Sequence, residues 1–577
     1  MQVRSEKSWG IDWAGIGWLF LFFWYFSCAP QLLIQITGTS GFTGFRQAFL
    51  MSALWLVPVL LFPAKTRAIA GVIGAVLWLG SLVSLGYFFI YGQEFSQSVI
   101  FIMFESNMAE SSEYLTQYFA WWMIAGFALH TVLAYLLWRR VRPLQMKGRP
   151  AYAMAVVMLL SSVGYPLISQ TLQEKTFAAA MLKVEARVEP AVPWQLVLGY
   201  RQYREQLNNM QGMLTDAAKV PPLKNLKSSQ GEQPTTLVLV IGESTNRQRM
   251  SLYGYPRNTT PNLDKLRNDL LVFDDVVTPR PYTIEALQQV LTFADEENPD
   301  LYLKTPSIVS MMKQAGFKTY WITNQQTMTK RNTMLTTFSE QADEQVYLNN
   351  NRNQNARQYD GDVLAPFAKV LQEDAPKKFI VVHLLGTHMS YQYRYPPEFE
   401  KFTDRTGAPA RLRDDQVATY NSYDNAVLYN DFVVSSLIGE YAKKDDNGFL
   451  LYLSDHGEDV FDSESGNVLG RNEGKPTAPM YTIPFMVWAS PKWRQGHEWN
   501  LTADTSRPYS SSQLIHTWAD LAGLSFDEYD ASKSIVSASF KERPRMIGDP
   551  YAGKKSLIDF SLIKPKAVKK ELETAQQ

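Results

Sequence analysis

Residues 235–244 read TTLVLVIGES, an apolar run that leads directly into Gly242, Glu243 and Ser244. A short apolar run without polar alternation is typical of a strand that is buried on both faces of a sheet. Open α/β sheets bind their ligands beyond the carboxyl ends of the strands. The stretch therefore predicts a central strand at 237–241 that delivers Glu243 to a binding edge.

Runs of the same kind recur downstream and alternate with helical patterns. Strands are predicted at 270–277, 318–323, 379–385, 449–453 and 483–488, and helices near 307–314, 362–372, 420–441 and 513–522. Such alternation predicts an α/β domain at 235–577 with a mostly parallel central sheet and helices on both faces.

Potential metal ligands lie at two further strand ends. His383 lies within one predicted strand and His388 follows it, while Asp455 and His456 follow another after Ser454. The chain has six histidines, so three at two strand ends is a notable concentration. Carboxylate and imidazole ligands suit zinc or manganese better than calcium. Because an isolated Asp-His-Gly is usually a turn, only the joint pattern predicts a metal site.

The long apolar runs lie almost entirely within residues 1–172. A membrane-spanning helix needs about 20 mostly apolar residues. Five candidates are present, at roughly 13–33, 47–62, 69–91, 119–138 and 151–172, and the second is the shortest. Trp and Tyr near the ends of these runs are typical of a membrane–water boundary. The pattern predicts an α-helical membrane domain of five transmembrane helices.

Basic residues between the runs predict how the chain crosses the membrane. Lys65 and Arg67 separate the second run from the third. The loop before the fifth run holds five more: Arg139, Arg140, Arg142, Lys147 and Arg149. Cytoplasmic loops are rich in Lys and Arg, so both loops and the amino terminus are expected inside. Five spans then place the rest of the chain on the outer side.

Residues 173–234 are expected to form interfacial helices and a linker. A helical pattern interrupted by Pro190 and Pro193 is followed by a polar stretch with prolines. The net charge of zero and the lack of a broad basic patch give no indication of nucleic-acid binding. Cys28, the only cysteine, lies in the first apolar run, so the outer domain is expected to fold without disulfides.

Four motifs, with the five apolar runs before them, resemble the phosphoethanolamine transferases of Gram-negative envelopes. These enzymes belong to the alkaline phosphatase and sulfatase superfamily. The motifs are residues 235–264 (TTLVLVIGESTNRQRMSLYGYPRNTTPNLD), Pro281-Tyr282-Thr283, residues 379–391 (FIVVHLLGTHMSY) and residues 451–458 (LYLSDHGE). Within the family, the chain is most similar to the members that modify the heptose phosphate of the lipopolysaccharide core.

The resemblance implies a site and a location. The family places its nucleophilic threonine about forty residues after the Glu of the GE motif, where this chain has Thr283. The implied zinc ligands are Glu243, Thr283, Asp455 and His456. The implied location is the inner membrane, which the chain crosses several times, with the carboxy-terminal domain in the periplasm.

The resemblance also implies a two-step transfer. Thr283 is expected to attack the phosphorus of phosphatidylethanolamine, and a lipopolysaccharide phosphate then takes the phosphoethanolamine group from Thr283. His383 and His388 are expected to hold phosphate oxygens or to protonate a leaving group. Asn324 and Lys330 are further candidates for this pocket.

A loop between the third and fourth runs matches the family less closely. The family has Thr-x-x-x-Glu there, and this chain has Ser106 and Glu110, whose carboxylate is suited to the ethanolammonium of the donor. A solvated loop is the other interpretation. Family members often carry a further His after the DHGE motif, but residues 469–474 read LGRNEG. One zinc site is therefore expected, and Arg471 is a candidate to hold an acceptor phosphate.

Other functions remain open at this point. Transfer to lipid A or to a periplasmic glucan needs the same nucleophile, and a phosphoglycerol transferase of envelope polymers shares the plan of five spans and a threonine. A membrane scaffold without catalysis predicts no bound zinc. A sulfatase needs a Cys or Ser that becomes formylglycine, and Cys28 in the first apolar run does not suit that role.

Overall fold

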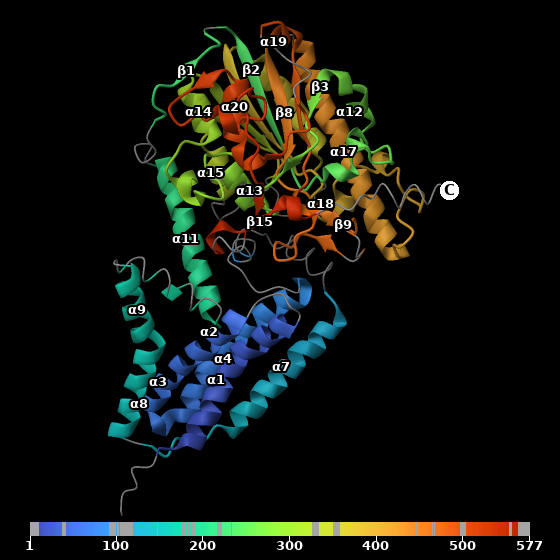
Figure 1. The fold of residues 1–577 in the computed structure, drawn as a ribbon. Coiled ribbons are helices and arrows are strands. Elements are labelled where there is room, and N and C mark those ends of the chain that lie inside the picture. The colour runs from blue at the N-terminus through green and yellow to red at the C-terminus, as the bar shows by residue number, and fades with distance from the viewer. Residues whose placement is uncertain are drawn as a thin grey trace, which may run out of the picture. The chain divides into compact units, whose positions relative to one another are not determined.

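The computed structural model describes most of the chain. The described residues are 11–36, 42–91, 100, 103, 119–146, 148–174, 177, 181, 184–185, 188, 191–215, 222–231, 233–325, 334–349, 358–444, 447–463, 466, 468–496, 504–552 and 557–563. They form two compact units, Met1–Gln206 and Leu207–Gln577 (Figure 1).

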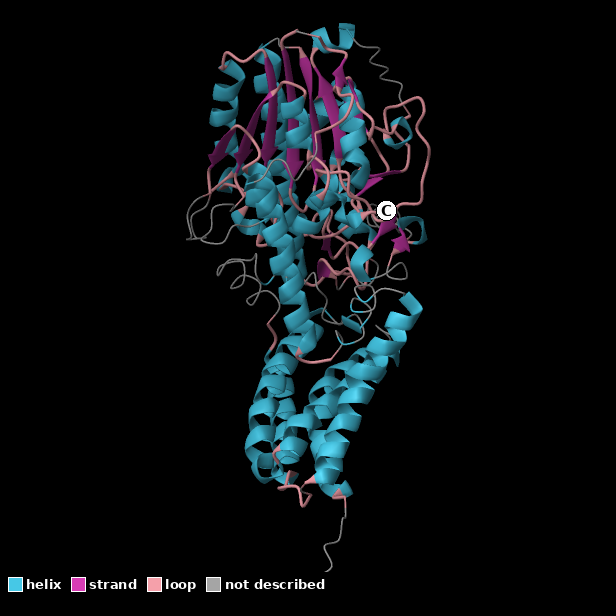
Figure 2. Ribbon diagram, turned by 90° about the vertical axis from the view of Figure 1, so that its left-hand side faces the viewer, coloured by secondary structure: helices cyan, strands magenta, loops and turns pink. Residues whose placement is uncertain are grey.

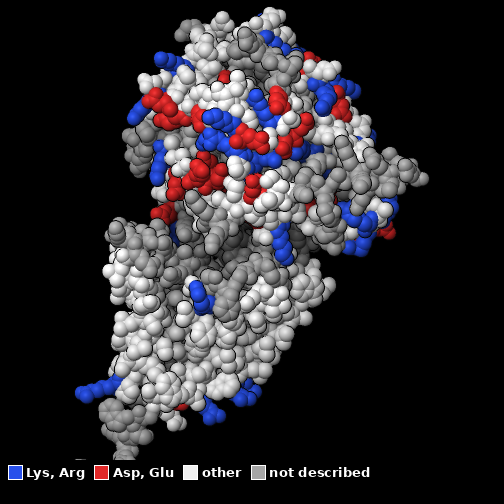
Figure 3. All heavy atoms as spheres, viewed as in Figure 1, with Lys and Arg blue, Asp and Glu red and all other residues white. Residues whose placement is uncertain are grey.

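The first unit is helical. Its main elements are α1 (Trp13–Ile36), α2 (Phe42–Ser52), α3 (Leu56–Leu61), α4 (Thr66–Tyr91), α7 (Trp121–Arg140), α8 (Arg149–Leu159) and α9 (Tyr165–Glu174), and α11 (Trp194–Thr215) begins in it. Large apolar side chains remain on its surface, such as Trp121, which is 80% exposed. In Figure 3 this surface is mostly uncharged, as expected for helices that face lipid.

Four helical stretches of the described residues are long and apolar enough to cross a membrane. They are Trp13–Ile36, Pro63–Ile90, Trp121–Arg140 and Arg149–Ser169. The second predicted span coincides with a shorter apolar stretch, Phe45–Leu61, which a short 3₁₀ turn interrupts at Ala53–Trp55. The described helices therefore give four spans of full length where the sequence predicted five.

Polar side chains pair with one another inside this unit. The ring of His130 on α7 lies 2.9 Å from the Tyr25 hydroxyl of α1 through Nδ1, and 2.8 Å from the Ser81 hydroxyl of α4 through Nε2. Polar groups in an apolar surrounding are stable only when their hydrogen bonds are satisfied. These bonds fix three helices to one another.

The second unit is built on a seven-stranded sheet with the order β3-β11-β8-β2-β7-β5-β6. The strands are β2 (Thr235–Gly242), β3 (Leu270–Val272), β5 (Lys318–Thr323), β6 (Glu344–Tyr347), β7 (Lys377–His383), β8 (Gly448–Ser454) and β11 (Phe485–Ala489). Strand β11 is antiparallel to both of its neighbours, and the other four pairings are parallel. The sheet is therefore mixed.

Helices cover both faces of this sheet (Figure 2). Trp518 of α20 (Leu514–Leu521) packs against Phe449 of β8, with 5.0 Å between ring centroids. Asn430 of α17 (Asp414–Lys444) donates to the hydroxyl of Tyr452 at 2.7 Å. Side chains three residues apart on a strand point to opposite faces, so α20 and α17 cover opposite faces. Charged side chains spread over the surface of this unit in Figure 3.

Two regions differ from the sequence predictions. The predicted strand at 270–277 is broken into β3 and β4 (Val276–Val277) by bends at Asp274 and Asp275, and β4 pairs with β12 (Tyr509–Ser510) outside the main sheet. The predicted linker contains a short strand, β1 (Lys227–Ser228), which pairs with β13 (Leu524–Ser525). Both pairings join segments distant in sequence, which a local apolar pattern cannot indicate.

The buried His516 of α20 gives this unit a specific sensitivity to acid. It is 5% exposed, and its Nδ1 accepts from the backbone N–H of Asp530 at 3.2 Å. Burial lowers the pKa of His516 from about 6.5 to about 4, with Lys533 adding to the effect. Between pH 6.5 and about 4, His516 is therefore protonated in the unfolded chain but neutral in the folded chain. The free energy of unfolding falls as the pH is lowered through this range.

His516→Gln should remove this loss. Between pH 7 and pH 4 the free energy of unfolding of the wild-type chain should fall by about 3 kcal/mol more than that of the variant. Urea unfolding of both proteins at a series of pH values measures the difference. Parallel stability curves for the two proteins would contradict the assignment.

Candidate functional site

The sheet register aligns the ends of its three central strands. Gly242 at the end of β2 lies opposite Ser454 of β8, and Ile241 lies opposite His383 of β7. The next residues along these strands therefore emerge at one edge of the sheet. Glu243 follows β2 at this edge, and Asp455 and His456 follow β8.

Three of these side chains meet. His456 Nε2 lies 3.2 Å from Glu243 Oε1 and 3.3 Å from Asp455 Oδ2. All three side chains are buried, and their potential ligand atoms lie within 4.8 Å of one another.

Thr283 completes the group from a different element. It is the first residue of helix α13 (Thr283–Val290). Its hydroxyl donates to Glu243 Oε2 at 3.1 Å and lies 3.3 Å from His456 Nε2. Unlike the other three side chains, Thr283 is partly exposed, so its oxygen is accessible to a substrate. The structure thus brings together all four residues predicted to bind zinc.

Hydrogen bonding leaves acceptor atoms facing the centre of this group. His456 Nδ1 lies 2.9 Å from the carbonyl of Gly457, so this nitrogen carries the proton and Nε2 is the acceptor, beside the two carboxylates and 2.6 Å from Arg471 Nη1. Asp455 Oδ1 accepts from the backbone of Ser244 and His456. Asp455 Oδ2 is buried without a hydrogen-bond donor among the described residues. A cation satisfies such a set of acceptors, and two carboxylates, a hydroxyl and an imidazole suit Zn²⁺.

The pKa values of the buried carboxylates also indicate that a cation would be stable between them. Burial raises the pKa of Asp455 well above its ordinary value, and the charge of Glu243 raises it further. Burial also acts to raise the pKa of Glu243, but its interactions with His456 and the charge of Arg471 bring it well below its ordinary value. Burial, and then Arg471, lower the pKa of His456, which keeps the ring in the neutral form that ligates metals.

Arg471 lies against the same group. Strand β10 (Leu469–Gly470) leads directly into it. Its Nη1 is 2.6 Å from His456 Nε2 and 3.8 Å from Glu243 Oε1, and its side chain is 13% exposed. The guanidinium therefore adds positive charge at the accessible side of the site, which suits an anionic ligand.

The two other predicted histidines differ in accessibility. His383 is fully buried, and neither ring nitrogen has a hydrogen-bond partner among the described residues. His388 is only partly buried, although its Nδ1 is enclosed and likewise has no such partner in the described part of the chain. Burial lowers the pKa of His383 to about 4 and that of His388 to about 3. Both rings are therefore neutral.

Of the remaining predicted residues, the structure describes only Asn324. Asn324 is fully buried, and its amide donates to Asp360 Oδ1 at 2.8 Å. This bond joins Asn324 to a framework of buried polar groups, and its contact with substrate stays a prediction. Ser106, Glu110 and Lys330 lie outside the described residues.

Asp360 holds the loop that follows β7. It accepts from the backbone N–H groups of Leu385 and Gly386 at 2.9 and 2.7 Å. Gly386 has a φ of +56°, and a Cβ there would lie 2.6 Å from the carbonyl oxygen of Glu243. Only glycine fits this contact. The loop after β7 thus packs directly against the backbone of Glu243.

Sequence reasoning missed two residues that donate to the Glu243 carboxylate. Gln325 Nε2 donates to Glu243 Oε2 at 3.2 Å, and the hydroxyl of Ser244 donates to Glu243 Oε1 at 2.8 Å. Gln325 stands just past the end of β5, as the other site residues stand past their strands, so its position was a usable signal. Together these donors fix the direction of the Glu243 carboxylate.

The chain is similar to known proteins over nearly its whole length. Residues 235–524 match the sulfatase family model. The chain is 52% identical over 557 residues to phosphoethanolamine transferase EptC of Escherichia coli K12, and 53% identical over 557 residues to phosphoethanolamine transferase CptA of Salmonella typhimurium. Each match covers 96% of this chain and 96% of the relative.

Solved structures also resemble the chain, and two of them bear on the site and the fold. The periplasmic domain of Escherichia coli EptC in complex with Zn is 58% identical, covers 59% of this chain and 97% of that one, and has a TM-score of 0.58. The integral membrane phosphoethanolamine transferase EptA of Neisseria meningitidis is 19% identical, with a TM-score of 0.63, and covers 92% of this chain and 99% of that one. The second likeness shows the fold alone.

Removal of single ligands tests the metal site. Glu243→Gln and Asp455→Asn should each weaken zinc binding by more than about 100-fold, because each removes a charged donor from a buried group. Competition against a chelating dye measures the dissociation constant. Asp415→Asn, which changes an exposed carboxylate on α17, is the control and should bind zinc as the wild type does. Equal zinc affinity in all four proteins would place the metal elsewhere.

Proposed function

The chain belongs to the sulfatase family and, within it, to the phosphoethanolamine transferases, and from this membership we propose its substrates, its site and its location. The protein transfers phosphoethanolamine from phosphatidylethanolamine to a lipopolysaccharide phosphate, with core heptose phosphate as the acceptor. The observation that carries this proposal is the position of the partly exposed Thr283 hydroxyl against the buried Glu243 and His456.

The choice of acceptor rests on the degree of similarity. The EptC and CptA relatives share more than half of their residues with this chain over 96% of its length. The Kdo(2)-lipid A phosphoethanolamine 7''-transferase of Escherichia coli is 27% identical over 66% of the chain. An acceptor in the core is therefore favoured over one in lipid A.

Glu243, Thr283, Asp455 and His456 would hold one Zn²⁺. When bound, zinc lowers the pKa of a ligated hydroxyl and withdraws charge from a phosphate. A single ion is favoured because Arg471 stands where many relatives have a further histidine. The donor set described above supports zinc, and the relative crystallised with Zn is 58% identical over the soluble domain.

The first step forms a covalent intermediate on the protein. Thr283 Oγ1 attacks the phosphorus of phosphatidylethanolamine, and the bond from phosphorus to the diacylglycerol oxygen breaks. The hydroxyl proton moves towards Glu243 Oε2, which accepts it at 3.1 Å. Glu243 passes this proton to the leaving oxygen, which departs as diacylglycerol. The amino end of α13, where Thr283 lies, favours the negative charge of the phosphate.

The second step regenerates the threonine. A hydroxyl oxygen of the acceptor phosphate attacks the phosphorus on Thr283, the bond to Oγ1 breaks, and the proton of that hydroxyl passes to Oγ1. Arg471 holds the acceptor phosphate, since its guanidinium is paired with the site and partly exposed. His388 donates to a phosphate oxygen through its neutral ring. His383 is fully buried, so it contacts the phosphate less directly than His388 does.

The location follows from the helical unit and from the relatives. We place the protein in the inner membrane with five spans, the second at Phe45–Leu61, its amino terminus in the cytoplasm and its catalytic domain in the periplasm. Residues 1–172 form the membrane domain, 173–234 the connector and 235–577 the catalytic domain. Ser106, Glu110 and Lys330 remain candidates for binding the donor.

Cells that lack the gene test this function. We expect complementation with the wild type to add one phosphoethanolamine unit to the lipopolysaccharide core, and complementation with Thr283→Ala to add none, because no other described hydroxyl takes the position of Oγ1. Purified Thr283→Ala should transfer at least about 1,000-fold more slowly than the wild type. Thr283→Ser, which keeps the hydroxyl, is the matched control and should retain part of the activity.

Mass spectrometry of the intact lipopolysaccharide and of its separated core and lipid A measures the result. A unit on lipid A would overturn the acceptor. A fully active Thr283→Ala protein would overturn the covalent step.

A further inference from the structure

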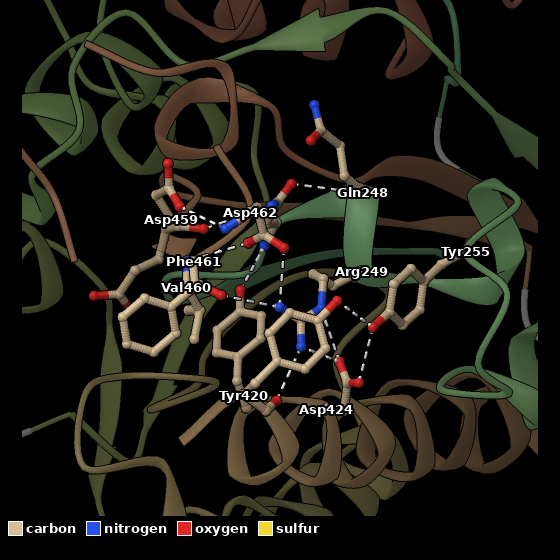
Figure 4. Close-up of polar contacts among 12 residues, drawn as sticks. Gln248, Arg249, Tyr255, Tyr420, Asp424, Asp459, Val460, Phe461 and Asp462 are labelled. Carbon is tan, nitrogen blue, oxygen red and sulfur yellow. Dashed lines mark hydrogen bonds and ion pairs between the residues drawn. The ribbon is translucent and has the colours of Figure 1, made fainter. Parts of the chain in front are cut away.

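A buried arginine that the chemistry does not use lies behind the site. Arg249 is 1% exposed. Its Nε donates to Asp424 Oδ1 at 2.9 Å, and its Nη1 donates to Asp462 Oδ1 at 3.0 Å. Its guanidinium lies over the ring of Tyr420, 3.5 Å from the centroid. Figure 4 shows Arg249 between these partners, which come from different parts of the chain.

Asp424, on helix α17, binds a second arginine through its other oxygen. Asp424 Oδ2 accepts from Arg257 Nη1 at 2.8 Å and from the Tyr255 hydroxyl at 3.0 Å. Burying charges in this way is weak grounds for a gain in stability, because desolvation offsets the attraction. A guanidinium that binds several acceptors does, however, hold each of these side chains in one orientation.

On its other side, Arg249 holds a β-hairpin. Strands β9 (Asp459–Val460) and β10 (Leu469–Gly470) are antiparallel. Asp462 lies just past β9, and its Oδ2 accepts from the Val460 N–H at 3.1 Å. The N–H of Asp462 donates to Asp459 Oδ1 at 2.8 Å. By holding Asp462, Arg249 therefore holds the hairpin itself.

This hairpin carries two residues of the site at its open end. His456 lies three positions before β9, and Arg471 directly follows β10. The two side chains touch each other, with 2.6 Å between Arg471 Nη1 and His456 Nε2. A shift of the hairpin therefore moves both residues relative to Glu243.

Helix α17 also holds the loop that carries Glu243. Tyr423, next to Asp424, donates its hydroxyl to the Ser244 carbonyl at 2.7 Å and accepts from the Asn246 N–H at 2.9 Å. Two adjacent residues of one helix thus fix two loops. One fixes the loop after β2 directly, and the other fixes the hairpin after β8 through Arg249.

We propose that Arg249 is a positioning residue for the metal site. It ties the β9–β10 hairpin to α17 and thereby keeps His456 and Arg471 in register with Glu243. The inference rests on the metal site of the proposed function, and it adds a residue outside that site that sets its affinity.

The test compares variants in the full chain purified in detergent. Arg249→Lys keeps the charge but loses the forked geometry, and Asp462→Asn removes the charged partner on the hairpin. Arg257→Lys is the matched control, since Arg257 shares Asp424 with Arg249 but has no contact with the hairpin among the described interactions. Zinc affinity is measured by chelator competition, and backbone hydrogen exchange of residues 456–463 is measured without zinc.

We expect Arg249→Lys and Asp462→Asn to bind zinc about 10- to 100-fold more weakly than the wild type and to exchange faster at 456–463. Arg257→Lys should bind zinc within about threefold of the wild type, because it leaves the Arg249–Asp462 contact that supports the metal site in place, even where its melting temperature falls. If Arg249→Lys does not fold, Asp462→Asn decides.

Two results overturn the inference. Either the Arg249 and Asp462 variants keep wild-type zinc affinity and exchange, or Arg257→Lys loses as much affinity as they do, which marks a general loss of stability. A wild-type chain that binds no zinc is a different outcome. It refutes the zinc site of the proposed function, and the exchange measurement still decides whether Arg249 holds the hairpin.

Discussion

Two buried carboxylates share one small volume with a neutral imidazole, and the rest of the site follows from that constraint. Glu243 and Asp455 both approach His456 Nε2 within 3.3 Å. Without a cation, one carboxylate is forced towards its protonated form, as the raised pKa of Asp455 shows. A divalent ion relieves both charges at once. The hydroxyl of Thr283, which also faces these atoms, then gains the environment that a nucleophile needs.

The fold holds this arrangement from several directions. The parallel register of β2 with β7 and β8 sets the level at which the ligands leave the sheet. Gly386 allows the loop after β7 to lie against the Glu243 backbone. Helix α17 fixes the other two loops through Tyr423 and Arg249. Since such supports set the geometry of ligands, they bear on affinity as well as on stability.

Much of the soluble fold could be predicted from the sequence because its central strands are continuous apolar runs. The strand predicted at 318–323 coincides with β5, and the helix predicted near 513–522 coincides with α20 to within a residue at each end. The reversed direction of β11 and the pairing of β4 with β12 were not predictable, since no local pattern reports which distant strand is a neighbour. The short helix Phe45–Leu61 shows that apolar content alone does not fix the length of a span.

Some site residues could likewise be predicted from the sequence, and others could not. Glu243, Asp455 and His456 were visible because they directly follow apolar runs. Thr283 depended on the family resemblance, because a threonine that begins a helix is ordinarily a capping residue. Arg249 carried no signal, since its partners Asp424 and Asp462 lie 175 and 213 residues away in the chain. Asn324 was predicted to contact substrate, and that role stays a prediction; what the structure adds is its bond to Asp360 in the framework.

X-ray diffraction from crystals of the full-length protein, recorded on both sides of the zinc absorption edge, tests the central claim most directly. The account predicts one anomalous peak per chain, about 2.0 to 2.2 Å from an oxygen of Glu243, Thr283 and Asp455 and from His456 Nε2. A peak at any other place in the chain, or none beside these four residues in crystals grown with zinc, would contradict it.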